Sequence, residues 1–215
     1  MINTLNQTPP QGATLLFNGK DVDNWKTRDG QPAGWKVEDG VLVVVPKSGD
    51  ILSEATFTDF FLHIEFRCPD MPEATGQGKA NSGVFLQGRY EIQVLDSYAW
   101  KTPGLGYCGA IYNQFSPLVN GCKPAMEWQT YDVIFRAPRK DEGEEAAKGP
   151  RVTVFHNGQL IHNNIQLPGV TGGAIDENLY EPGPLLLQDH NNLMAFRNIW
   201  AVSLPLKGSE EYGPQ

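Results

Sequence analysis

The chain has 215 residues, with 17 Lys and Arg against 25 Asp and Glu, which gives a formal net charge of −8. This acidic balance argues against a nucleic-acid binder, which would carry a basic patch, and against attachment to anionic membrane surfaces. A hydrophobic content of 40% supports a globular fold, and no window approaches the ~20 apolar residues of a membrane span. We therefore expect a single domain over residues 1–215 with a neutral partner such as a carbohydrate.

The segment from Met1 to Gln11 is polar and lacks the apolar h-region of a signal peptide. The chain is therefore expected to be either cytoplasmic or the mature form of an exported protein.

Cys108 and Cys122 flank a loop and would form a disulfide in an oxidising compartment, but reduced thiols are the favoured prediction. No Cys-x-x-Cys or His-Glu-x-x-His spacing occurs, so the sequence requires no cofactor and shows no zinc signature. No feature indicates an oligomeric state.

Short strand-like runs recur along the chain, and turn signals join several of them. In chain order, the expected strands are 15–17, 35–38, 41–44, 61–66, 83–87, 89–94, 131–136, 152–156, 159–162, 185–190 and 196–203. Asn18-Gly19, Asp39-Gly40 and Asn157-Gly158 are dipeptides that strongly predict hairpins, and Gly88 suggests another. The charged run 140–149 predicts a solvated loop. No long stretch shows helical spacing, so the pattern predicts an all-β sandwich or jelly roll with a core of about residues 15–204 between two tails.

The stretch from Arg89 to Ser97 begins as an alternating strand and then changes parity. Glu91 and Gln93 share one face, whereas Asp96 joins them only if a β-bulge near Val94-Leu95 absorbs one residue. A carboxyl group would then stand at each end of a polar row, and paired carboxylates are what glycosidic cleavage usually needs. The alternative interpretation is a solvent-facing polar stripe on an antiparallel strand.

Other predicted strands also combine an apolar face with a face rich in hydrogen-bonding groups. His63, Glu65 and Arg67 lie on one side of their strand, and Gln188 and His190 lie on one side of theirs. Such a face is either plain solvated surface or the floor of a cleft that binds sugar hydroxyls. Aromatic side chains in or beside loops would stack on sugar rings or, alternatively, pack in the core and rim. These aromatic residues are Tyr98, Trp100, Tyr112 and Trp128.

A set of segments, in the expected order, resembles one known family. They are Phe17-Asn18-Gly19-Lys20 with Trp25, Gly34-Trp35-Lys36-Val37-Glu38-Asp39-Gly40, Asn81-Ser82-Gly83-Val84-Phe85, Tyr90-Glu91-Ile92-Gln93-Val94-Leu95-Asp96-Ser97, Gly109-Ala110-Ile111-Tyr112, Glu127-Trp128-Gln129-Thr130-Tyr131-Asp132, and Leu187-Gln188-Asp189-His190 with Phe196-Arg197-Asn198-Ile199-Trp200. They are similar to the 3-keto-disaccharide hydrolase family, and the resemblance runs from about Leu15 to Leu204. It implies a concanavalin A-like jelly-roll sandwich of two antiparallel sheets and action on glycosides oxidised to a ketone at C3 of the sugar. It also implies a bacterial protein that is periplasmic or secreted.

A more distant resemblance is to retaining endo-β-glucanases, which share this fold and place Glu-x-Asp-x-x-Glu on a bulged strand. Glu91, Gln93 and Asp96 hold the matching positions in this chain. The second is an amide and the third is one methylene shorter than glutamate. Double displacement needs two carboxyl groups about 5–5.5 Å apart, so these changes disfavour it.

A 3-keto sugar offers an easier route, in which a base removes the C2 proton, the C3 oxygen becomes an enolate and the C1–O bond breaks by elimination. His190 and Glu91 are the leading base and acid candidates, in unassigned order, with Asp96 in reserve. The other three histidines are weaker candidates. The competing class is a non-catalytic carbohydrate-binding module or lectin that uses the same cleft.

Substrate contacts are expected from five further residues. Arg197 and Gln188 would polarise the carbonyl, and Asn81, Glu65 and Gln93 would orient hydroxyl groups. The alternatives are a structural ion pair between Arg197 and a glutamate, and a His190 that bonds only backbone. A divalent metal, either calcium or a transition metal, held by histidine and carboxylates would stabilise the enolate, but its position is left open.

Overall fold

The computed structural model describes residues 2–139 and 148–205, and within these ranges thirteen strands form two antiparallel sheets. The all-β prediction is thereby confirmed. The expected loop 140–149 lies almost entirely outside the described residues. A single short 3-10 helix (η1, Gly76–Gly78) interrupts the described strands and loops. None of the described helical structure is long and apolar enough to cross a bilayer.

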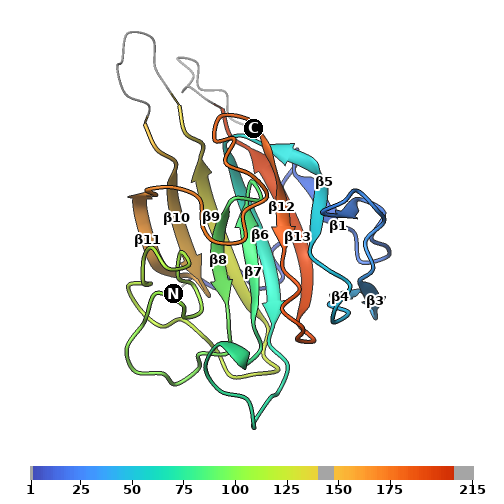
Figure 1. Cartoon of the computed structure of the whole chain (residues 1–215), viewed down its shortest axis with the longest axis vertical. Helices are drawn as coiled ribbons and strands as arrows, with labels where there is room; N and C mark the ends of the chain where they lie inside the picture. Colours follow the sequence, from blue (N-terminus) through green and yellow to red (C-terminus); the bar gives the residue numbers. More distant parts are fainter. Residues whose placement is uncertain (1, 140–147, 206–215) are drawn as a thin grey trace.

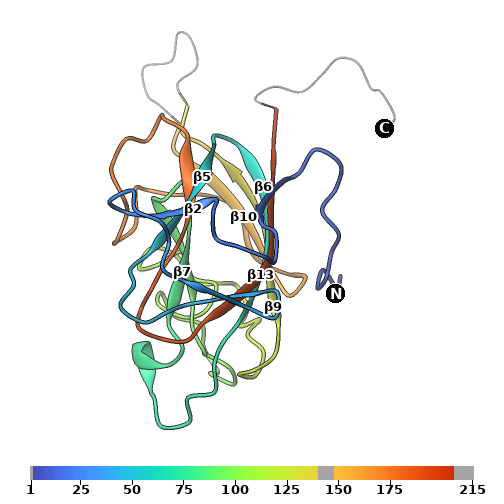
Figure 2. The ribbon, with the colours of Figure 1, turned by 90° about the vertical axis from the view of Figure 1, so that its right-hand side faces the viewer.

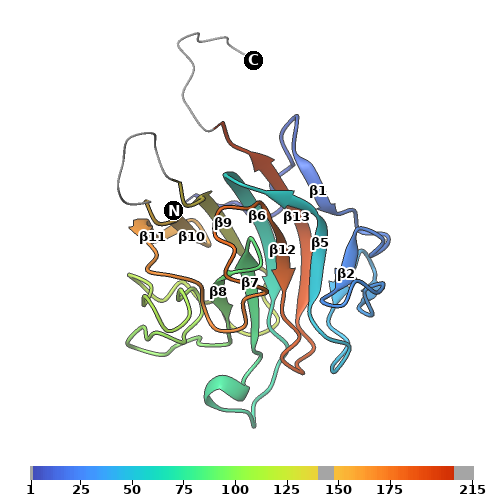
Figure 3. The ribbon, with the colours of Figure 1, turned by 45° about the horizontal axis from the view of Figure 1, so that its top comes forward.

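The larger sheet has eight strands in the order β11-β10-β9-β6-β13-β4-β3, and β1 also pairs with β13. Its strands are β1 (Thr14–Phe17), β3 (Lys36–Glu38), β4 (Val41–Val43), β6 (Phe60–Arg67), β9 (Gln129–Arg136), β10 (Arg151–His156), β11 (Gln159–Gln166) and β13 (Ala195–Ser203). The smaller sheet has five strands in the order β2-β5-β12-β7-β8. They are β2 (Trp25–Thr27), β5 (Ile51–Phe57), β7 (Ser82–Leu86), β8 (Tyr90–Val94) and β12 (Gly183–Leu187). Figures 1 and 3 show the strands of the two sheets overlapping as layers.

The two sheets enclose one hydrophobic core because their strands alternate between apolar and polar residues. On β6, Leu62 and Ile64 belong to the core, while Glu65 points to the opposite side of its sheet. On β8, Ile92 belongs to the core, while Glu91 points to the opposite side of its own sheet. Figure 2 shows the sheets side on, with β2, β5 and β7 in one layer and β6, β9, β10 and β13 in the other. Glu65 and Glu91 therefore lie on opposite outer faces of the sandwich.

Three of the expected hairpins are confirmed, because β3 pairs with β4, β7 with β8 and β10 with β11. The hairpin expected at Asn18-Gly19 is wrong: β1 pairs with β13, and the next strand, β2, lies in the other sheet. Strand β12 ends at Leu187, so Gln188 and His190 follow the strand instead of lying in it. The sequence pattern missed β2 and β5.

The expected bulge at Val94-Leu95 is absent from the ladder, which pairs β7 and β8 regularly from Ser82 with Val94 to Leu86 with Tyr90. The alternation between core-facing and outward-facing side chains does change there, because Val94 and Leu95 both enter the core and β8 ends at Val94. A bulge is found instead in β13, where the register shifts between Arg197 and Trp200.

All three cysteines are free thiols buried in the core. Cys108 Sγ lies 3.1 Å from the hydroxyl group of Tyr131 on β9. That hydroxyl group reaches across the core and donates to Gln93 O on β8 at 2.6 Å. The thiol region thus backs the strand that carries Glu91 but does not reach its outer face.

Candidate active site

Glu91 lies on β8, the edge strand of the five-stranded sheet, and its side chain faces the outer side of that sheet. Its side chain is only 3% exposed, and no described residue forms a hydrogen bond with its carboxyl group. Room for the carboxyl comes from Gly83 on β7, since a Cβ atom there would stand 2.6 Å from Glu91 Oε1 and 2.7 Å from the Phe85 ring. The backbone on both sides is anchored: Glu91 N donates to Thr171 Oγ1 at 2.9 Å, and Tyr112 N donates to Glu91 O at 3.1 Å.

The protonation state of Glu91 follows from this setting. Burial raises the pKa of the Glu91 carboxyl to about 8, and the negative charge of Asp50 adds to the shift. A carboxyl with such a pKa keeps its proton at neutral pH. It can therefore donate a proton to a leaving oxygen, whereas it would be a poor nucleophile.

Amide side chains extend the site from Glu91 along β8. Gln93 Nε2 donates to Gln77 Oε1 at 2.9 Å, and Asn81 Nδ2 donates to Gln77 O at 2.7 Å. Gln77 Nε2 donates in turn to Gly106 O at 2.8 Å, and a Cβ on Gly106 would stand 3.6 Å from the Tyr112 ring. Gln93 Oε1 is buried and accepts no hydrogen bond. The structure thus links Gln93 and Asn81 through Gln77, and the Tyr112 ring lies beside Gly106, the residue that accepts from Gln77.

An ion pair borders the site on the β5 side. Arg28 Nε lies 2.8 Å from Asp50 Oδ2, and Arg28 Nη2 donates to Gly173 O at 2.6 Å. Gly173 packs against Phe85, since its Cβ position is 3.3 Å from that ring. Arg28 therefore joins the Gly173 loop, which packs on Phe85, to the Asp50 carboxylate, whose negative charge raises the pKa of Glu91.

Gln188 and His190 lie at the end of β12, on the loop next to this face. Gln188 N donates to Gly83 O at 3.0 Å, which fixes it beside the glycine that accommodates Glu91. His190 is exposed, and its loop is held by Asp189 N donating to Asp50 Oδ1 and by Asn81 N donating to Asn192 Oδ1. The Asp189 carboxylate also holds this loop, because its Oδ1 accepts from Asn191 N at 2.8 Å and its Oδ2 accepts from Gly49 N at 3.1 Å.

Asp96, the reserve candidate, is committed elsewhere. Its Oδ2 lies 3.1 Å from Lys79 Nζ, and its Oδ1 accepts from Tyr98 N at 3.2 Å. Asp96 follows the end of β8, so it does not extend the polar row that contains Glu91 and Gln93. The paired carboxylates expected on one sheet face are not formed.

Three expected substrate contacts lie on the opposite face of the sandwich. Arg197 Nε lies 2.8 Å from Glu65 Oε2, and the Arg197 guanidinium stands 4.1 Å from the centre of the Trp128 ring. Arg67 approaches the same ring at 4.8 Å. The ion-pair alternative for Arg197 is confirmed, with Glu65 as partner. Asn198 also faces this side, because the β13 bulge reverses its expected parity and lets Asn198 Nδ2 donate to Glu65 Oε1 at 3.0 Å.

The comparisons with known proteins decide the family. A family model described as "3-keto-alpha-glucoside-1,2-lyase-like domain" matches residues 12–202. The chain belongs to this family. A proposed glycosyl hydrolase from Parabacteroides distasonis is 40% identical and superimposes with a TM-score of 0.81, over 92% of this chain and 86% of that one. No curated protein matches the chain.

More distant structures show the fold alone. A second proposed glycosyl hydrolase from Parabacteroides distasonis is 24% identical, with a TM-score of 0.63 over 90% of this chain and 94% of that one. The potassium-bound carbohydrate recognition domain of Emp46p is 9% identical, with a TM-score of 0.50 over 90% of this chain and 98% of that one. These structures confirm the jelly-roll sandwich that the sequence predicted, and the family match makes the chain a glycosyl hydrolase-like or carbohydrate-binding domain.

The sequence reasoning missed four polar residues of the site of this family member. Gln77 lies in η1, whereas Asp50, Arg28 and Thr171 come from loops far apart in the chain. Gln77 and Thr171 bond to the Glu91 strand, while Asp50 and Arg28 hold the surrounding loops through Asp189 and Gly173. Only tertiary contacts reveal them, because single polar residues in loops show no periodic pattern.

The described residues contain no group of three or more His, Cys, Asp and Glu side chains placed to hold a metal ion. His190 and the carboxylates therefore do not form the ligand set that a divalent metal would need, and no step is assigned to one.

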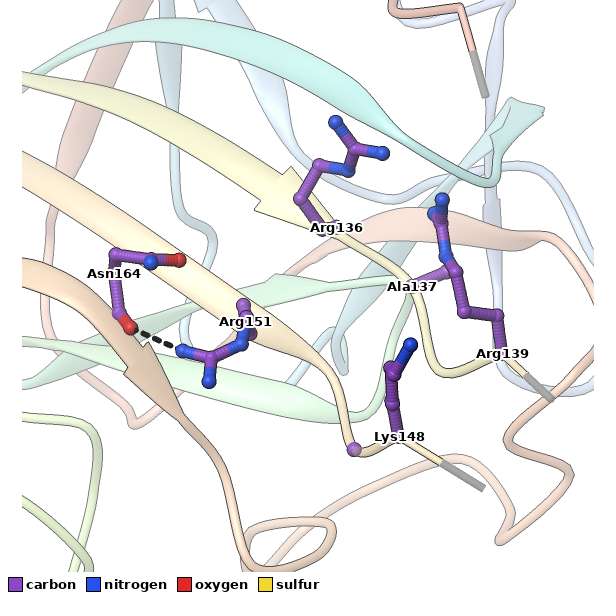
Figure 4. Close-up of a pocket in the computed structure, with 7 residues that line it drawn as sticks. Arg136, Ala137, Arg139, Lys148, Arg151 and Asn164 are labelled. Atoms are coloured by element: carbon purple, nitrogen blue, oxygen red, sulfur yellow. Dashed lines mark hydrogen bonds between the residues drawn. The ribbon is translucent and has the colours of Figure 1, made fainter. Parts of the chain in front are cut away.

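A separate hollow of about 260 Å³ opens where β9, β10 and β11 meet the loop between β9 and β10 (Figure 4). Its lining is mostly basic, with Arg136, Arg139, Lys148 and Arg151 among the contributors. Asp59 pairs with two of these, at 2.8 Å from Arg136 Nε and 2.5 Å from Arg139 Nη2. The described residues that line this hollow include no carboxyl group and no histidine, so we do not place the candidate active site there.

Proposed function

We propose that this chain cleaves glycosides that carry a ketone at C3 of the sugar, by proton abstraction at C2, elimination of the C1 substituent and hydration. The observation that carries the proposal is the Glu91 carboxyl, which is buried opposite Gly83 and has its pKa raised to about 8. Elimination expels an alkoxide that needs a proton, and a carboxyl that stays protonated at neutral pH supplies it. Glu91 is thereby assigned as the general acid.

His190 is the proposed base, since the remaining histidines are placed elsewhere. His63 lies on the outer face of the eight-stranded sheet, where its Nδ1 is 2.7 Å from Asp132 Oδ1. His156 is buried in the core, and His162 is committed to Gly109 O at 2.7 Å. His190 is exposed beside the Glu91 face, so a C2 proton of a bound sugar is accessible to it.

Charge on the developing enolate needs hydrogen-bond donors. The side-chain amide of Gln188 is the proposed donor to the C3 oxygen. The Gln188 backbone N–H is bonded to Gly83 O, which holds this residue beside the Glu91 face. Arg28 supports the site electrostatically, because its ion pair with Asp50 holds a cation beside this face. Arg28 takes the role that the sequence reasoning gave to Arg197.

The steps balance as a net hydrolysis. His190 takes the C2 proton, the C1–O bond breaks as C1=C2 forms, and the leaving oxygen takes the proton of Glu91. The oxygen of a water molecule then adds to C1 while Glu91 takes a proton from that water, and His190 returns its proton to C2. These transfers give the free 3-keto sugar and restore both residues. The family description, which names a lyase of 3-keto-alpha-glucosides, supports the elimination step.

The retaining glucanase mechanism receives less support. Its second carboxylate would have to be Asp96, which is paired with Lys79 at 3.1 Å. The remaining member of the row, Gln93, is an amide and cannot share a proton with its neighbours.

The test compares p-nitrophenyl 3-keto-glucoside with its unoxidised parent, each with and without EDTA. We expect cleavage of the keto form only, and a loss of about 10²–10⁴-fold in kcat for Glu91→Gln and for His190→Ala. Leu193→Ala, on the same loop and 58% exposed, is the control that keeps wild-type rates.

Cleavage of the parent glucoside would favour the glucanase mechanism instead. Binding of both sugars without turnover, unchanged in Glu91→Gln, would favour the non-catalytic carbohydrate-binding module. Loss of turnover with EDTA, restored by a divalent metal, would require a metal step that the proposal does not contain.

A further inference from the structure

We propose that the outer face of the eight-stranded sheet holds a second binding site, for a neutral oligosaccharide, which residues 2–8 cover in this structure. These residues are called the strap below. Figure 2 shows the N-terminal segment running along the outside of the layer that contains β13. The site is separate from Glu91, which lies on the outer face of the other sheet.

Beneath the strap lies a network of ionisable groups that is unusual for an outer sheet face. His63 Nδ1 lies 2.7 Å from Asp132 Oδ1, and His63 Nε2 lies 3.6 Å from Glu65 Oε1. Glu65 continues the network to Arg197 at 2.8 Å. His63 and Glu65 have fully buried side chains. Buried charges are costly to desolvate, so such a network contributes little to stability compared with apolar packing. A binding role explains why it is present.

The strap is held mainly by hydrogen bonds to this network. Thr4 Oγ1 donates to Asp132 Oδ2 at 2.6 Å, and the backbone N–H of Asn6 donates to Glu65 Oε1. Arg197 Nη2 donates to Asn6 Oδ1 at 2.9 Å. Ile2, the large apolar side chain at its start, is 74% exposed. Leu5 is half-buried and is the one large apolar side chain of the strap that packs against the sheet face. Since the strap otherwise contacts this face through hydrogen bonds, a ligand that supplies equivalent hydrogen bonds can replace it.

Hollows flank the strap on both sides. One of about 460 Å³ is lined by residues 6–9 together with Phe17, Arg197 and Asn198. The other, of about 240 Å³, is lined by Ile2, Asn3 and Leu5 together with the β9 and β10 region. With the strap displaced, the two hollows and the network between them would form one continuous groove.

The charges of the groove select the class of ligand. Glu65 and Asp132 contribute two negative charges, Arg67 and Arg197 contribute two positive charges, and Lys123 lines the smaller hollow, so charges of both signs are spread along the groove. The groove offers acceptors and donors side by side, and a sugar hydroxyl group both donates and accepts.

The test loosens the strap in a Glu91→Gln background, so that binding at the other face is not turned over. Thr4→Val removes one strap donor without a change of shape. Asn6→Gly removes the acceptor for Arg197 and keeps the backbone, because Asn6 has a φ of 61° that glycine adopts freely. Isothermal titration calorimetry would use four neutral hexasaccharides, from β-1,3-glucan, cellulose, amylose and xylan, with hexagalacturonate as the anionic probe.

We expect the double strap variant to bind at least one neutral hexasaccharide about tenfold more tightly than Glu91→Gln alone. Adding Asn198→Gly should abolish the gain, since Asn198 has a φ of 46° and glycine preserves the bulge while the donor is lost. Thr8→Val, an exposed position on the strap, is the matched control without a gain. Thermal unfolding checks that each variant is folded, and Asn6→Gly alone replaces the double variant if that fails to fold.

The proposal is wrong if no neutral hexasaccharide gains affinity, if the gain survives Asn198→Gly, or if hexagalacturonate gains equally. Asn198→Gly in the otherwise wild-type chain should leave turnover of the 3-keto-glucoside unchanged. A loss of that turnover would show that the two faces are not independent.

Discussion

Gly83 and Glu91 occupy neighbouring strands in such a way that the glutamate carboxyl fills the space a side chain on the glycine would need. Oε1 of Glu91 lies 2.6 Å from the position of a Cβ atom on Gly83. The pKa of that carboxyl is raised to about 8, so it keeps its proton at neutral pH. The glycine thus determines where the proposed acid stands.

Gly83→Ala should displace the Glu91 carboxyl, because real Cβ atoms do not approach other atoms so closely. We expect kcat/KM on the 3-keto-glucoside to fall about 100-fold, with a loss of stability of about 1–3 kcal/mol from overpacking. Gly169→Ala is the matched control, since a Cβ there meets nothing within 4 Å. Wild-type kinetics in Gly83→Ala would show that the position of Glu91 is not critical.

The pKa of Glu91 also predicts a pH-dependent stability that requires no substrate. The folded-state pKa is raised from 4.5 to about 8, so the contribution is complete below pH 4.5 and is lost as the pH rises to about 8. Denaturant unfolding should therefore show wild-type stability falling relative to Glu91→Gln across this window, by at most about 1.4 kcal/mol per pH unit. Parallel pH profiles for the two proteins would contradict the raised pKa.

Asp50→Asn tests the second cause of that pKa. Removing the negative charge should lower the pKa of Glu91, so the alkaline limb of the pH–rate profile should move to lower pH. The shift should be smaller than the total displacement, because burial is the larger cause. The asparagine side-chain oxygen can still accept the hydrogen bond that Asp189 N donates to Asp50 Oδ1 at 2.9 Å in the wild type. An unmoved alkaline limb would assign it to another group.

Glu65→Gln separates the two faces of the sandwich. Glu65 has its pKa lowered to about 2: its burial opposes the shift, and hydrogen bonds from His63, Asn198 and Arg197 outweigh that burial. Its stabilising contribution is present above pH 4.5 and is lost as the pH falls towards 2. We expect the variant to lose about 2–3 kcal/mol near neutral pH, measured by denaturant unfolding, with turnover retained. A large loss of kcat in a folded Glu65→Gln protein would contradict the placement of the active site on the Glu91 face.

The sequence was a good guide wherever a local pattern controls the structure. Alternation placed Glu91 and Gln93 on one face of their strand, and the Asp39-Gly40 and Asn157-Gly158 dipeptides marked real hairpins. It failed where one residue changes the register. The expected bulge after Val94 is a strand end, whereas a bulge does follow Arg197, where two consecutive polar residues, Arg197 and Asn198, interrupt the apolar alternation.

The sequence by itself determined that this chain is an all-β sandwich with polar outer faces, because strand periodicity and turn chemistry act over a few residues. Only the tertiary structure decided which polar residues share a face. Glu65 and Arg197 belong to one sheet and Glu91 to the other, while Asp50 and its partner Arg28 come to the Glu91 site from distant loops and Gln77 comes from η1. The pKa of Glu91 was equally beyond the sequence, because it depends on burial and on a charge contributed by another segment.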